Sequence, residues 1–148
     1  MSRSLFFTFI ISLYTAALSA QIIIPESITI ARDAYGVPHI YGKTDADAAY
    51  GLAWAHAEDD FESIQLNLLP GRGLAGSVQG KEGVLFDYGL KFTGLDTTVP
   101  KLYQTDISAD FKKVLNGYVQ GLNAFALKFP ERILHKDLFP VTEIDILH

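Results

Sequence analysis

Hydrophobic and polar residues alternate over a short stretch early in the chain. Ile28 and Ile30 are each followed by a smaller or more polar residue, which is the two-residue period of a half-buried strand. The loop that follows contains Gly36, a residue type that adopts positive φ angles at low cost. Residues 37–41 then resume an extended path, because Pro38 disfavours a helical conformation in the residue before it. This pattern predicts an N-terminal β-hairpin.

The next segment has the apolar spacing of a helix, from Thr44 to about Leu69. Asp47 follows Thr44 by three residues, which is the spacing of a capping box at a helix start. The first half of the segment is rich in alanine and contains Gly51, so we expect another helix or a sheet to approach it closely. Pro70 marks the end of what we predict to be one long helix.

A second long helix is predicted to open at residues 106–108 and to end near residues 129–130. We expect its apolar face to pack on the first helix and to form a two-helix core. The residues of this face are Phe111, Val114, Leu115, Tyr118, Leu122, Phe125 and Phe129. Between the two helices, the glycine-rich residues 71–83 predict a structural loop or a short helix, and residues 84–100 predict a short helix and a loop.

Composition narrows the class of protein. The 148 residues are 49% hydrophobic, which is enough for one modest domain with a core and argues against disorder. The formal net charge of −5 argues against nucleic acid as a partner. The chain has no cysteine, which excludes disulfides, thiolate zinc sites and a cysteine nucleophile. Residues 76–81 are one residue too short for a phosphate-binding loop, so we do not expect a nucleotide there.

The first twenty residues have the pattern of a secretory signal. Arg3 is their only charged residue, an apolar run covers residues 5–18, and small residues precede Gln21. The apolar run is short for a bilayer span, which takes about 20 residues. We therefore predict a signal peptide over residues 1–20, a periplasmic or secreted location, and no membrane contact once the signal is removed.

The hairpin and the first helix also carry a spaced pattern of specific residues that resembles the opening of the penicillin acylase family. These proteins are N-terminal-nucleophile amidohydrolases and include acyl-homoserine-lactone acylases. The likeness continues weakly through residues 71–80 and returns in residues 118–124 and 138–145. The positions that carry the pattern, for which we expect a structural role, are Arg32, Asp33, Tyr35, Gly36, Pro38, His39, Asp47, Gly51 and Asp59.

The resemblance implies a fold larger than this chain. The family fold is a four-layer αββα sandwich, with two antiparallel sheets between layers of helices. The fold class expected here is therefore α+β: a partial sandwich that is mostly helical and has an N-terminal hairpin. Residues 21–148 would form the incomplete N-terminal part of such a domain, within its α segment.

The resemblance also implies a mechanism. Family precursors cut themselves so that a serine becomes the N-terminus of a β segment, and this serine attacks the amide. That β segment would be the main partner of this chain, and the substrate would be a small acylated amide. We expect no catalytic residue, no metal ligand and no cofactor here. The family positions for a calcium ligand and for part of the acyl pocket lie just past Asp145, so calcium would belong to the complete enzyme.

Three groups of residues have a chemical interpretation beside the structural one. His39 can transfer protons, but no serine or cysteine lies near it in the sequence, so a packed histidine is favoured. His56 and Asp60 share a helical face at metal-ligand spacing, but two ligands do not make a metal site. Arg32 and Asp33 would form a salt bridge at the strand end or contact substrate. Relatives usually carry arginine where Asp60 stands, which puts an ion pair at that position in doubt.

A second capping box, at Thr142 and Asp145, opens a helix shortly before the last residue. We interpret the chain as the front portion of a secreted amidohydrolase that acts on penicillin-, acyl-homoserine-lactone- or acyl-amino-acid-type substrates. Two alternatives remain: a non-catalytic exported helical module that binds a partner through its acidic face, and an inactive acylase remnant. An α segment without its β segment should expose apolar surface.

Overall fold

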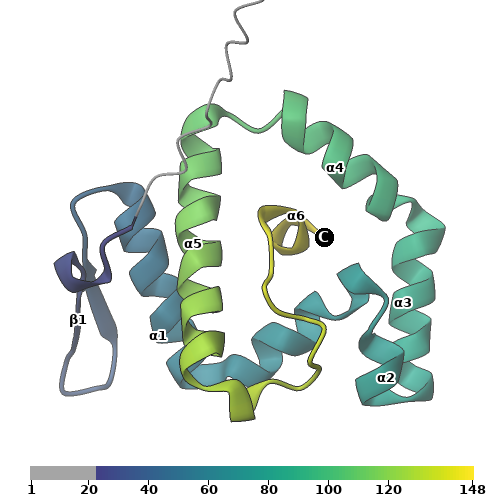
Figure 1. The fold of residues 1–148 in the computed structure, drawn as a ribbon, viewed down its shortest axis with the longest axis horizontal. Helices are drawn as coiled ribbons and strands as arrows, with labels where there is room; N and C mark the ends of the chain where they lie inside the picture. Colours follow the sequence, from purple (N-terminus) through teal and green to yellow (C-terminus); the bar gives the residue numbers. More distant parts are fainter. Residues whose placement is uncertain (1–22) are drawn as a thin grey trace, which may run out of the picture.

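The computed structural model describes residues 23–148, so the predicted signal peptide lies outside the described residues (Figure 1). Two strands come first and helices follow. The strands and α-helices are β1 (Thr29–Arg32), β2 (Pro38–Tyr41), α1 (Asp45–Leu68), α2 (Ala75–Gln79), α3 (Lys81–Thr93), α4 (Leu95–Thr105), α5 (Ala109–Lys128) and α6 (Glu143–Leu147). Short 3-10 turns are η1 (Pro25–Ser27), η2 (Pro70–Arg72) and η3 (Pro130–Arg132). The expected mostly helical fold with an N-terminal hairpin is confirmed.

Strands β1 and β2 form an antiparallel hairpin in which Ile30 pairs with Ile40. Gly36 has the positive φ of +84° that the turn between them requires. The hairpin rests on α1 at Gly51, where an added Cβ would lie 2.6 Å from Ile40 Cγ2 and 3.0 Å from Ile28 Cγ2. Only a glycine at this position allows the two isoleucines to reach the helix.

Helix α5 packs along α1 through two glycines one turn apart. A Cβ at Gly117 would lie 2.2 Å from the carbonyl oxygen of Ala46, and one at Gly121 would lie 2.4 Å from that of Tyr50. The expected close approach to the first half of α1 is thus confirmed. The core formed between the helices contains the fully buried Ala53, Ala57, Phe61, Leu69, Ala75, Leu122, Phe125 and Leu138. Phe111, expected on the packed face, is instead 47% exposed, because the first turn of α5 lies beyond this core.

The predicted single helix is broken by a kink. Asp60 has φ −151° and ψ 73°, outside the helical region, and its Oδ1 accepts a hydrogen bond from the Ser63 amide at 3.0 Å. This is the geometry of an aspartate that caps a new helix start. The predicted long helix is therefore present over the expected residues, but it is kinked at Asp60, whose carboxylate caps the second half of α1.

The stretch between the long helices is also more helical than predicted. Residues 84–100 were expected to contain a short helix and a loop, whereas α3 and α4 together cover nearly all of residues 81–105. Gly94, with φ +70°, is the only residue between them. The glycines of residues 81–105 interrupt the apolar spacing by which a helix is predicted, so the sequence underestimated the helical content there. The glycine-rich residues 71–80 before this stretch form η2 and the short α2, as predicted.

Within the described residues, no helix combines the length and the apolar character that crossing a membrane takes.

Replacing Gly117 or Gly121 with alanine tests the backbone contact between α1 and α5. We expect each variant to lower the free energy of unfolding by roughly 1–3 kcal/mol, because the added methyl group must push the helices apart. Gly89→Ala is the matched control, since a Cβ there meets nothing within 4 Å in α3. It should be neutral or stabilising by up to about 1 kcal/mol through helix propensity. Urea unfolding followed by circular dichroism measures all three, and equal losses in all of them would contradict the packing described.

Candidate functional site

The family-motif residues gather where the hairpin meets α1. Arg32, at the end of β1, reaches across to this helix: its Nη2 lies 2.8 Å from Asp59 Oδ1 and 3.2 Å from Glu58 Oε2. Its Nη1 donates to the carbonyl oxygen of Gly36 at 2.8 Å. The hydrogen bonds that Arg32 donates to the carboxylates of Asp59 and Glu58 raise the pKa of Arg32. The predicted pairing of Arg32 with its neighbour Asp33 is wrong, because adjacent strand residues point to opposite faces and the acids of α1 lie on the side of Arg32.

Asp33 organises the turn instead. Its Oδ1 accepts hydrogen bonds from the amides of Tyr35 and Val37 at 2.9 and 3.0 Å, and its Oδ2 lies 3.4 Å from His39 Nε2. The backbone hydrogen bond from Val37, followed by that from Tyr35, lowers the pKa of Asp33. The carboxylate therefore stays ionised and holds the loop between the strands in one conformation.

The other motif residues hold backbone in place. Pro38 pairs with Arg32 at the end of the ladder, where its missing amide hydrogen costs little. Asp47 is buried and closes the predicted capping box, accepting from the Thr44 amide at 3.0 Å while its own amide donates to Thr44 Oγ1 at 3.1 Å. Tyr35 is different: it is 93% exposed at the hairpin tip and is free to meet another surface.

The residues considered for proton transfer and metal binding are engaged elsewhere. The His39 side chain is about half exposed and contacts Asp33. His56 Nδ1 lies 3.3 Å from the Tyr118 hydroxyl, which ties α1 to α5. Among the described residues, no three histidine, cysteine or acidic side chains come together at a position that could hold a metal ion.

A second group of polar side chains, which the sequence patterns did not reveal, holds the irregular segment from η3 to α6. Arg72 donates from Nε and Nη2 to the two carboxylate oxygens of Asp145, at 2.8 and 2.7 Å. It also donates to the carbonyl oxygens of Asp137 and Pro140, at 3.2 and 2.7 Å. Asp145 in turn accepts from the amide and hydroxyl of Thr142. The capping box between Thr142 and Asp145 was predicted from their spacing. The pairing of Asp145 with Arg72 was not predicted, because the two residues are 73 positions apart in the sequence.

Two amide side chains complete the support of this segment. Asn123 exchanges two hydrogen bonds with the backbone of Val141, at 2.8 and 2.9 Å. The buried Gln65 donates to the Arg132 carbonyl oxygen at 3.0 Å and accepts from the Leu134 amide at 2.8 Å. A segment without regular structure must find partners for its backbone polar groups, and here they come from side chains of the helices.

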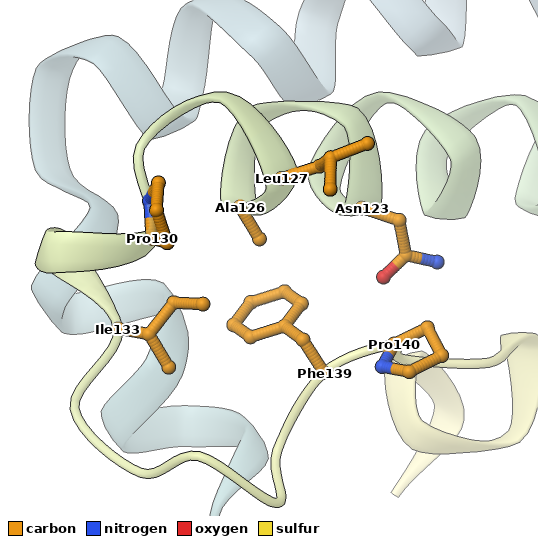
Figure 2. Close-up of a pocket in the computed structure, with 7 residues that line it drawn as sticks. All are labelled: Asn123, Ala126, Leu127, Pro130, Ile133, Phe139 and Pro140. Carbon is orange, nitrogen blue, oxygen red and sulfur yellow. The ribbon is translucent and has the colours of Figure 1, made fainter.

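A groove of about 460 Å³ lies between the end of α5 and this segment (Figure 2). Its lining residues are Asn123, Ala126, Leu127, Pro130, Ile133, Phe139 and Pro140. Asn123 is the polar member, and its amide already serves Val141. The groove therefore offers apolar contact without a titratable group among its lining residues.

These features define a class of structure: a helical scaffold with an N-terminal hairpin, in which the motif residues fasten one element to the next. The family model for penicillin amidase matches residues 27–143. The chain belongs to this family, and the resemblance expected from the sequence is confirmed.

Individual relatives agree with the family match. The chain is 30% identical over 111 residues to the penicillin acylase 2 proenzyme of Pseudomonas sp. (strain SE83), a match that covers 73% of this chain and 14% of the relative. It is 29% identical over 114 residues to penicillin G acylase of Escherichia coli, covering 75% of this chain and 13% of the relative. An acyl-homoserine lactone acylase, QuiP of Pseudomonas putida, is 24% identical over 108 residues, covering 73% and 13%.

A solved structure has the same fold. The chain superimposes on thermostable penicillin G acylase from Alcaligenes faecalis with a TM-score of 0.63 and 26% sequence identity, over 82% of this chain and 68% of that one. The chain thus spans about a seventh of the length of the curated relatives but two thirds of the solved chain.

We refer to the hydrogen bonds of Arg72 with Asp145 and with the carbonyl oxygens of Asp137 and Pro140 as the Arg72 clamp, and changing Asp145 to asparagine tests it. Burial raises the pKa of Asp145, but the hydrogen bonds from Arg72 and Thr142 outweigh it, so the net pKa lies below the ordinary value. Such a carboxylate contributes stability above its unfolded pKa of about 3.9 and loses it as the pH falls through the lower folded pKa. At pH 7 we expect Asp145→Asn to cost about 2–3 kcal/mol, less than for a fully buried pair because the Arg72 side chain is 26% exposed.

Urea unfolding at a series of pH values measures this effect. The difference in unfolding free energy between the wild type and Asp145→Asn should shrink as the pH falls from 5 to about 2. Asp110→Asn is the control, because Asp110 pairs with Lys113 on the surface and is 92% exposed; this variant should match the wild type at neutral pH. A pH-independent difference for Asp145→Asn would rule out the ion pair as its cause.

Proposed function

We propose that this chain is the front part of the α segment of an exported amidohydrolase, made as a precursor, that cleaves the amide bond of acylated amines. The nucleophile is the N-terminal serine of a β segment encoded beyond these residues. The candidate substrates are penicillins, acyl-homoserine lactones and acyl-amino acids. Export is supported by the signal-like pattern of residues 1–20.

The observation that carries the proposal is the family match combined with the lengths of the relatives. Both relatives named as penicillin acylases are about seven times longer than the matched region, and one of them is named a proenzyme. The solved acylase chain is far shorter, since a similar stretch covers 68% of it. A short chain and a long precursor in one family are what cleavage of the precursor into segments would produce.

The local geometry supports placing the chemistry elsewhere. Several serine hydroxyls have structural partners: Ser27 and Ser77 donate to the carbonyl oxygens of Ile24 and Leu74, and Ser108 accepts from the Phe111 amide. The Ser63 side chain hydrogen-bonds to the Asp60 carboxylate and lowers the pKa of that aspartate. An internal serine also lacks the free α-amino group that the proposed mechanism uses as its base.

In the proposed reaction, the serine hydroxyl attacks the amide carbonyl carbon while its own α-amino group accepts the proton. An α-amino group titrates at about pH 7.7–8.0, so it can act as a base near neutrality without a histidine. The C–N bond then breaks, the amine leaves with the proton, and an acyl-serine ester forms. Water hydrolyses this ester and releases the acid. In this scheme the hairpin junction and the Arg72 clamp act as scaffold.

Expression of the complete coding sequence tests the proposal. We expect self-cleavage into two chains and release of free amine from at least one of penicillin G, an acyl-homoserine lactone and an acyl-amino acid. Changing the serine at the new N-terminus to alanine should leave one uncut chain and lower the hydrolysis rate by about 10³-fold or more.

The 148-residue chain alone is the second arm of this experiment, and it should release no amine from any of the three substrates. Hydrolysis by this chain alone would overturn the assignment of the nucleophile to a β segment. A complete protein that stays uncut and inactive would favour the inactive remnant.

A further inference from the structure

Helix α3 carries large apolar side chains on its surface. Val84, Leu85 and Phe86 are consecutive and are 55%, 72% and 59% exposed. Further along the helix, Tyr88 and Phe92 are 66% and 78% exposed, and their rings stack 6.0 Å apart. Runs of three exposed apolar residues are avoided on ordinary soluble surfaces and mark interaction sites. We refer to Leu85, Tyr88 and Phe92, which lie on one side of the helix at positions i, i+3 and i+7, as the α3 stripe.

The α3 stripe lies on a helix that is firmly held at its base. A Cβ at Gly83 would lie 2.1 Å from the carbonyl oxygen of Ala75, so α3 touches α2 backbone to backbone. One turn later, the carboxylate of Asp87 accepts hydrogen bonds from the Ala75 and Gly76 amides at 3.0 and 2.9 Å. The stripe faces away from these contacts, since its three side chains remain exposed.

The far end of the α3–α4 pair is fastened as well. Lys112 of α5 donates to the carbonyl oxygen of Gln104 at 3.3 Å, and its ammonium group lies 4.7 Å from the centre of the Tyr103 ring. Figure 1 shows α3 at the rim of the molecule, with α4 running from it toward the start of α5. Tethers at both ends stop α3 from folding its apolar side chains onto the core, and Gly83 is the only buried residue of α3 and α4 within the described chain.

The charges of this region indicate the chemistry of its partner. Residues 81–105 contain three lysines and three acidic residues, whereas the whole chain has a net charge of −5. An electrically balanced surface with aromatic and leucine side chains suits an apolar protein face, since burial of such side chains is the main source of interface energy.

We propose that the α3 stripe is a docking surface for the larger, β-segment part of the same precursor. The proposal rests on the proposed function, because it takes from it the existence of that segment. The relatives support this occupant: the region matched here is about a seventh of each curated acylase, so most of such a protein is available to cover a face that this chain leaves open.

Hydroxyl-radical footprinting of the complete precursor and of the 148-residue chain tests the docking. In the chain alone, Tyr88 and Phe92 should be oxidised rapidly, because both rings are exposed. In the complete protein their oxidation should slow several-fold. Phe125 is 1% exposed and should react slowly in both, which controls for loss of the folded structure. Equal rates for Tyr88 and Phe92 in the two proteins would overturn the proposal.

The double variant Leu85→Gln/Phe92→Gln gives an independent test. In the isolated chain it should raise solubility, because two exposed apolar side chains are lost. In the complete protein it should lower the affinity between the two segments roughly tenfold or more, because large apolar side chains are lost from the interface. Lys91→Gln is the matched control, since it introduces the same residue in the same helix without removing apolar surface. An undiminished association in the double variant would contradict the docking.

These outcomes separate the two proposals. A complete protein that hydrolyses amides but leaves the α3 stripe unprotected overturns the docking alone. One that protects the stripe but neither cuts itself nor hydrolyses amides overturns the proposed function and keeps the docking. Protection that appears in the 148-residue chain alone and grows with its concentration identifies a second copy as the occupant, which also overturns the proposal.

Discussion

The structure depends on the close approach of other elements to the backbone of α1. Gly117 and Gly121 bring α5 so near that any side chain at either position would meet a carbonyl oxygen of α1. On α1 itself, Gly51 gives the hairpin isoleucines the same access. The alanines between these contacts are buried because they are small enough to fit. Small residues that look featureless in the sequence therefore set the distances at which the large ones meet.

Packing between the helices follows from that spacing. Phe61 and Phe125 meet edge to face, with ring centres 5.0 Å apart, and Trp54 packs against Phe125 at 5.3 Å. Each fully buried side chain of this size contributes about 1.5–3 kcal/mol, and aromatic pairs add somewhat more. If α1 and α5 were farther apart, all of these aromatic contacts would be lost at once. The aromatic core therefore depends on the glycine contacts, because these set the distance between α1 and α5 at which the rings can meet.

The sequence predicted what local patterns encode. The hairpin, the capping box of Thr44 and Asp47 and the small face of α1 each arise from residues near one another in the chain, and the structure has all three. It could not predict the partner of Arg72, because that ion pair joins positions 73 residues apart and depends on where η2 meets α6. The kink at Asp60 was hidden for another reason: an aspartate in a helical pattern is equally compatible with a surface position and with a cap.

The motif residues gain a common physical meaning from their positions. Arg32 donates hydrogen bonds to the turn and to two acidic residues of α1, and Asp33 accepts hydrogen bonds from the amides of the same turn. A hairpin of four-residue strands is marginal by itself, since two short strands bury little surface. These ionic contacts and the Gly51 contact therefore fix its orientation on α1. They also hold Tyr35 at the tip of the hairpin, with 93% of its surface exposed.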